Sequence, residues 1–143
     1  MVEGAKKFQA YLEAQAIDGF QIEELHNEEE TVLFRTAVTV QGQFVPLAVI
    51  FDQTIYVVIR ANVAPKAMDD NNVYALETLI RRLNYQNKLF KYYVTPDASI
   101  MLDACVPMLP ENFSAALLYT MVNVIAHEIE TRHVEWMNTV WQT

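Results

Sequence analysis

The sequence contains few of the residues that cross-link a chain or bend it sharply. Of its 143 residues, one is a cysteine (Cys105) and three are glycines. A single cysteine cannot form an internal disulfide bond, and the glycines at 4, 19 and 42 form no glycine-rich phosphate-binding motif. The sequence therefore excludes a disulfide-stabilised scaffold and a dinucleotide-binding or P-loop signature. The absence of disulfides also favours a reducing compartment, and we expect a cytoplasmic protein.

Positive charge is scarce as well. Ten lysines and arginines stand against eighteen aspartates and glutamates, so the formal net charge is -8 and the pI is near 4.7. Nucleic-acid binding depends on lysine and arginine contacts to phosphates, and we expect no nucleic-acid partner. The longest apolar runs, 44–51 and 115–122, are much shorter than the roughly 20 residues of a membrane span. The first residues also lack the apolar segment of a secretory signal, so no membrane partner is expected.

The composition that remains is that of one folded domain. Hydrophobic residues make up 52% of the chain and charged residues 20%. No linker, repeat or low-complexity tract divides the sequence, so residues 1–143 are predicted to form a single domain. A chain of this length buries roughly 68–70% of its unfolded surface and folds without a metal or a disulfide.

Hydrophobic periodicity predicts the order of the secondary-structure elements. Helical spacing occurs at 3–16, from 69 or 70 to 84, and from 112 or 114 to 136 or beyond. Strand-like alternation or short apolar runs occur at 20–25, 31–40, 44–51, 54–59, 89–94 and 99–106, with a loop predicted at 60–70. The order α-β-β-β-(β)-α-β-β-α predicts an α+β fold, in which helices pack on an antiparallel sheet of about five strands.

The segment from His127 to His133 contains the side chains that metal sites use. A metalloprotease helix needs histidines four positions apart, but these are six positions apart, roughly 240° around the helix. Glu130 and His133 have the spacing of a di-iron carboxylate pair, which needs a second pair that the chain lacks. We expect a solvated glutamate, a histidine at the edge of the apolar stripe, and no metal or cofactor. The alternative is a metal-dependent enzyme or small-ligand binder that uses His127, Glu130 and His133.

Other candidate catalytic groups lack the neighbours that their chemistry requires. Cys105 lies in an apolar strand pattern without a nearby histidine, which predicts a small buried hydrophobe and not a nucleophile. Asp103 in the same strand is expected to point outward. The acidic residues between 23 and 30 lack the alternating ligands and the glycine of a calcium loop. We predict no catalytic, cofactor-binding or metal-binding residues and a protein that is not an enzyme.

Aromatic residues gather around one helix–hairpin unit, which also carries the main local concentration of positive charge, at Arg81, Arg82, Lys88 and Lys91. We expect Arg81 or Arg82 to pair with acidic residues. Aromatic side chains are enriched at the centres of protein interfaces. The predicted partner contacts are Tyr85, Phe90, Tyr92 and Trp141. The apolar end of the last helix forms either a homodimer interface or a contact within one subunit.

A resemblance to a known family rests mainly on Leu76–Pro107. A helix ends in the R-x-N-like turn of Leu79–Asn84, the strand Lys88–Val94 follows, and an acidic turn at Pro96-Asp97 leads to a second strand, Ser99–Val106. This pattern, with the long final helix, resembles the YbjN family of small bacterial proteins, whose fold is that of the type III secretion chaperones.

The resemblance implies a non-enzymatic domain with a regulatory or chaperone-like role, and the secretion chaperones are typically acidic homodimers. It supplies no catalytic residues. From the sequence we therefore predict a cytoplasmic homodimer that binds an extended or amphipathic protein segment through apolar surface.

Overall fold

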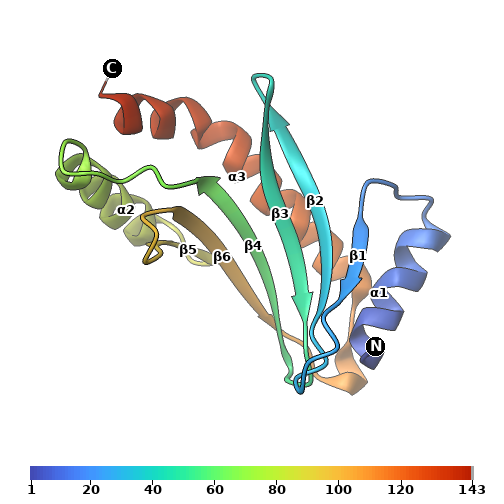
Figure 1. The fold of residues 1–143 in the computed structure, drawn as a ribbon. Helices are drawn as coiled ribbons and strands as arrows, with labels where there is room; N and C mark the ends of the chain where they lie inside the picture. The colour runs from blue at the N-terminus through green and yellow to red at the C-terminus, as the bar shows by residue number, and fades with distance from the viewer. Residues whose placement is uncertain (143) are drawn as a thin grey trace.

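The computed structural model describes residues 1–142, in which three α-helices lie on one face of a six-stranded antiparallel sheet (Figure 1). The helices are α1 (Glu3–Ala14), α2 (Val73–Gln86) and α3 (Ala115–Trp141), with a short 3-10 helix, η1 (Pro110–Asn112). The strands are β1 (Gln21–Glu24), β2 (Val32–Val40), β3 (Gln43–Phe51), β4 (Tyr56–Ala64), β5 (Phe90–Val94) and β6 (Ile100–Pro107). The predicted α+β class and element order are confirmed, but the sheet has six strands and not about five.

The sheet order is β1-β2-β3-β4-β6-β5. The first four strands form an antiparallel meander, and α2 then connects β4 to the edge strand β5. The β2–β3 hairpin turns at Gln41 and Gly42, both of which have positive φ (50° and 77°). Positive φ at both central residues matches the twist of a tight hairpin, and glycine adopts it without strain. This turn joins the strands that were predicted at 31–40 and 44–51.

The core lies between the sheet and the helices, because alternate residues of each strand point toward the helices. In β6, every second residue from Ile100 to Val106 is buried. Beneath α1, the ring of Phe8 contacts Phe34 and Phe51, with centroids 5.1 Å and 5.6 Å away. Figure 1 shows α3 running diagonally behind the sheet, where it supplies a buried row made of Leu118, Val122, Ile125, Ile129, His133 and Trp136.

Asn84 joins α2 to the edge strand β5. Its Oδ1 accepts a hydrogen bond from the backbone N–H of Tyr92 (2.8 Å), and its Nδ2 donates to the backbone oxygen of Tyr92 (3.0 Å). The sequence predicted that Asn84 ends the helix, but α2 continues to Gln86. Asn84 thus acts on β5 as a neighbouring strand would, by satisfying one N–H and one C=O group.

One strand prediction is corrected. β4 continues to Ala64 instead of ending at Ile59, so part of the predicted loop at 60–70 is strand. Pro46 lies inside β3, and the register between β3 and β4 begins one residue later, at Leu47. Proline has no N–H to donate, so its place just outside this ladder agrees with its chemistry.

Replacing Asn84 with alanine is expected to lower the free energy of unfolding by about 1–3 kcal/mol, because the N–H and C=O groups of Tyr92 lose their partners. Urea denaturation measures the change. Asn123→Ala, on an exposed turn of α3, is the control and should change stability by less than about 0.5 kcal/mol. An Asn84→Ala protein as stable as the wild type would contradict this role.

Candidate functional site

The face of the sheet opposite the helices, here called the open face, has no helix packed on it among residues 1–142 (Figure 1). Alternate residues of the strands point toward it, and the antiparallel register aligns them across the sheet. Two neighbouring cross-strand rows, one apolar and one charged, dominate its centre.

The apolar row consists of Leu33, Ile50, Val58 and Cys105, each the register partner of the next. Leu33 is 9% exposed, Ile50 and Val58 are half-buried, and Cys105 is exposed. The row therefore crosses four strands and reaches solvent without a helix to cover it. Apolar side chains arranged in this way form a surface that a protein partner could cover.

The charged row consists of Arg35, Ala48, Arg60, Asp103 and Lys91, again in register. Arg60 donates two hydrogen bonds to the carboxylate of Asp103, each 2.9 Å long. The hydroxyl of Tyr93 donates a third, of 3.0 Å. The bond to Asp103 raises the pKa of Arg60, whereas burial, followed by the charge of Asp103, raises the pKa of Tyr93.

The second arginine of the open face is also paired. The Nε and Nη2 atoms of Arg35 donate to Oε1 of Glu23 at 3.0 Å and 2.8 Å. Both sides of this pair are about half exposed, so it contributes little to stability. This pairing matters for binding. Both arginines of the open face already have acidic partners, so a bound molecule would contact the face mainly through apolar side chains.

Two hollows flank the Arg60–Asp103 pair. The first has a volume of about 510 Å³ and a largely aliphatic lining, made of Leu33, Arg35, Thr36, Pro46, Leu47, Ala48, Ile50, Arg60, Asn62 and Met101. The second has a volume of about 460 Å³ and carries two lysines, its lining being Val58, Lys88, Leu89, Phe90, Lys91, Asp103 and Cys105. The ion pair therefore separates an aliphatic hollow from a basic one.

The four predicted contact residues do not form one surface. Tyr85 is 92% exposed near the end of α2, and Phe90 is half-buried and lines the basic hollow. Trp141 is 72% exposed and lines a separate cleft of about 330 Å³, beside Phe44. These three residues stay predicted contacts, at different places on the molecule.

Tyr92 is not available to a partner, so its inclusion among the predicted contacts is corrected. Its side chain is 2% exposed, packs on Trp136 with ring centroids 4.9 Å apart, and donates a hydrogen bond to Glu128 (2.7 Å). Alternation in β5 turns it toward the helices. Burial, and then the bond to Glu128, raise its pKa well above the ordinary value of 10.0.

The candidate metal ligands of α3 point in different directions. His127 and Glu130 are exposed, and a ring nitrogen of His127 lies 3.4 Å from the hydroxyl of Thr131. His133 is 3% exposed and belongs to the buried row, so its expected place at the edge of the stripe is corrected. Within residues 1–142, no three or more histidine, cysteine or acidic side chains come together as metal ligands.

Cys105 was predicted to be buried, and that prediction is wrong. It is exposed because strand alternation directs Ile100, Leu102 and Ala104 inward and places Cys105 with Asp103 on the open face. The sequence interpretation missed the open face as a whole. The signal for it was the almost uninterrupted apolar run at 44–51, because a strand with a solvated face should alternate with polar residues.

Comparison with protein-family models, with curated proteins and with solved structures gives no match for this chain. The resemblance to the YbjN family and to the secretion chaperones therefore stays a prediction. None of the helices within residues 1–142 has both the length and the apolar character to cross a membrane.

The burial of Tyr92 predicts a specific alkaline dependence of stability. A folded-state pKa above the unfolded value of about 10 means that only the unfolded chain loses this proton as the pH rises through 10. Tyr92 should therefore make stability fall by up to roughly 1.4 kcal/mol per pH unit above about pH 10. Urea denaturation of wild type and Tyr92→Phe between pH 9 and 11 measures this slope.

Tyr92→Phe is expected to show a shallower decline than the wild type, because it has no phenol to ionise at this buried position. Tyr85→Phe, at a ring that is 92% exposed, is the matched control and should retain the wild-type slope. Identical slopes for Tyr92→Phe and wild type would contradict the burial of the Tyr92 phenol and would make Tyr92 a candidate contact residue again.

Proposed function

We propose that the chain is a non-enzymatic protein-binding domain, chaperone-like or regulatory, whose open face receives an extended or amphipathic segment of a partner protein. The observation that carries this proposal is the apolar row from Leu33 to Cys105, which crosses four strands without a covering helix among the described residues. Burial of such a row is favourable in proportion to the apolar area removed from water.

The charges of the open face support an apolar mode of binding. Burying an unpaired charge is costly, but Arg60 already forms two hydrogen bonds with Asp103, and Arg35 forms two with Glu23. A segment laid over the face would therefore cover neutralised pairs. The lysines of the basic hollow, Lys88 and Lys91, would then favour an acidic group at one end of the segment.

The proposal includes a homodimer, with a second uncovered surface as its support. Along α3, four apolar side chains are exposed: Leu117, Val124, Val134 and Trp141. Tryptophan and the other aromatic residues are enriched at interface centres, and Trp141 is the aromatic member of this group. A dimer formed along α3 would leave both open faces free for partner segments, since α3 lies behind the sheet (Figure 1).

A metal-dependent enzyme built on His127, Glu130 and His133 receives less support. One of its ligands is buried in the core, while the other two face solvent. Catalytic zinc sites need three protein ligands around an open coordination position. The geometry of α3 therefore favours a packing role for His133.

The variant Val58→Lys tests the binding function, because it places a charge at the centre of the apolar row. The probe is permanently unfolded lysozyme with its cysteines blocked by carboxamidomethyl groups, a chain that presents extended apolar segments. We expect the wild type to bind it and Val58→Lys to bind about tenfold more weakly, since a lysine there would be buried without a partner. Fluorescence anisotropy of the labelled probe gives the affinities.

Val94→Lys is the matched control, because Val94 is a strand valine that is 37% exposed and lies on the opposite side of the sheet. It should bind as the wild type does, and urea denaturation verifies that both variants fold. Equal affinities for Val58→Lys and wild type, or no binding by the wild type, would refute the proposal. Light scattering on the same samples should give twice the subunit mass of 16.4 kDa. A mass of 16.4 kDa would refute the homodimer but not the proposed binding of a partner segment.

A further inference from the structure

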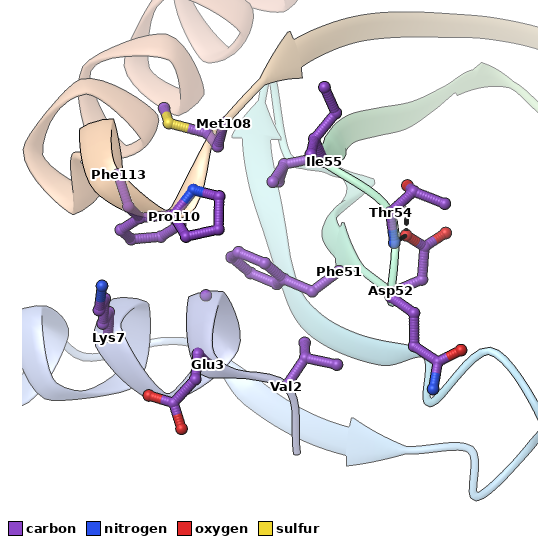
Figure 2. A pocket seen from close by; sticks show the side chains of 13 residues that line it. Val2, Glu3, Lys7, Phe51, Asp52, Thr54, Ile55, Met108, Pro110 and Phe113 are labelled. Carbon is purple, nitrogen blue, oxygen red and sulfur yellow. Dashed lines mark hydrogen bonds between the residues drawn. The ribbon is translucent and has the colours of Figure 1, made fainter.

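A cavity of about 300 Å³ lies between the first turns of α1, the β3–β4 turn and the segment that follows β6 (Figure 2). We call it the α1 pocket. Its lining is mostly apolar, from Val2, Gly4, Phe51, Ile55, Val57, Met108, Pro110 and Phe113, and the polar lining residues are Glu3, Lys7, Asp52, Gln53 and Thr54. None of these residues belongs to the apolar or the charged row, so the α1 pocket is separate from the open face.

Several features of the sequence shape this pocket. Gly4 lets α1 approach the aromatic wall closely, because a Cβ atom there would lie 3.1 Å from Phe113 and 3.4 Å from Phe51. On the far side, Met108 donates a backbone hydrogen bond to Ile55 (2.7 Å), which ties the end of β6 to the β3–β4 turn. The walls are thus held by backbone contacts and by close ring packing.

The mouth of the α1 pocket carries a lysine without an ion pair. Among residues 1–142, Lys7 makes no salt bridge, and its Nζ lies 5.6 Å from the centre of the Phe113 ring. The acidic groups at the mouth have partners of their own, although the neutral donors of Asp52 leave its charge in place. Glu3 pairs with Lys6 at 3.3 Å, and Asp52 accepts hydrogen bonds of 2.8 Å and 2.6 Å from the backbone and the hydroxyl of Thr54.

We propose that the α1 pocket binds a small amphiphilic carboxylate, whose apolar body lies between Phe51, Ile55 and Phe113 and whose charged group faces Lys7. The volume is at the lower end of the range for small-molecule sites, which is roughly 300–1,000 Å³. An anion complements Lys7, whereas a cationic amphiphile would meet Lys7 and find Glu3 already paired. This function goes beyond the binding of protein segments, because it uses different residues and a different class of ligand.

The test uses decanoate, decanol and decyltrimethylammonium below their micelle-forming concentrations, with binding followed by titration calorimetry. Decanoate is expected to bind the wild type at least about fivefold more tightly than decanol does, because the charge-assisted contact to Lys7 contributes of the order of 1 kcal/mol. The ammonium analogue should bind more weakly than decanol. Lys7→Met should remove the preference for decanoate and leave the binding of decanol unchanged.

Two further variants locate the site. Lys66→Met is the matched control, since Lys66 is an exposed lysine that does not line the pocket, and it should keep the wild-type preference. Ile55→Trp places a larger side chain at a position that is 36% exposed and should abolish binding of both decanoate and decanol by filling the cavity. Urea denaturation confirms that each variant is folded.

No binding of decanoate by the wild type would overturn the proposal. An unchanged preference in Lys7→Met would overturn the assigned role of Lys7, and with it the choice of an anionic ligand. Unchanged binding by a folded Ile55→Trp protein would place the ligand elsewhere and refute the α1 pocket as its site.

Discussion

A sheet with apolar side chains on both faces gains stability when both faces are covered, and within residues 1–142 this chain supplies helices for only one of them. The hydrophobic effect stabilises the packing of the helices on the covered face, where α3 alone buries Trp136 and five other side chains. On the other face the row from Leu33 to Cys105 remains at the surface. The unequal cover explains why the candidate site lies on strands and not in a cleft between helices.

The open face carries charged side chains beside its apolar row, and these charges are paired with one another. Arg60 and Asp103 lie opposite each other on β4 and β6, and Tyr93 completes the carboxylate's partners. A related network works on the covered face, where Tyr92 binds Glu128, which pairs with Arg132 at 3.8 Å. The expected pairing of Arg82 is also present, with Glu135. The carboxylates of Asp103 and Glu128 therefore both have partners, one on each side of the sheet.

Much of the fold follows from local signals in the sequence. Periodicity located the helices, and Ser114 begins α3 as a capping residue should, by accepting a hydrogen bond from the N–H of Leu117. The loop predicted at 60–70 was wrong in part. It included Arg60 and Asn62, two polar residues that alternate outward from β4 beside buried Ile59, Ala61 and Val63.

The candidate site was less predictable than the fold. Cys105 was assigned to the core for its apolar neighbours, and Tyr92 to the surface for its aromatic character, and each lies where the other was expected. Which face of a strand is covered depends on where distant helices dock. The sequence of a strand does not show where distant helices dock. Its periodicity therefore separates the two faces of the strand but does not tell which face is buried.

Cys105 offers the most direct measurement of the central claim, that a partner segment covers the open face. It is the only cysteine, and it is exposed within the apolar row. The rate at which iodoacetamide alkylates it reports access to that row. With saturating cysteine-blocked unfolded lysozyme, the account predicts a rate at least about tenfold lower than in the free protein, because a covered thiol opens to the reagent only when the complex does. An unchanged rate in a fully formed complex would show that the partner binds elsewhere and would contradict the account.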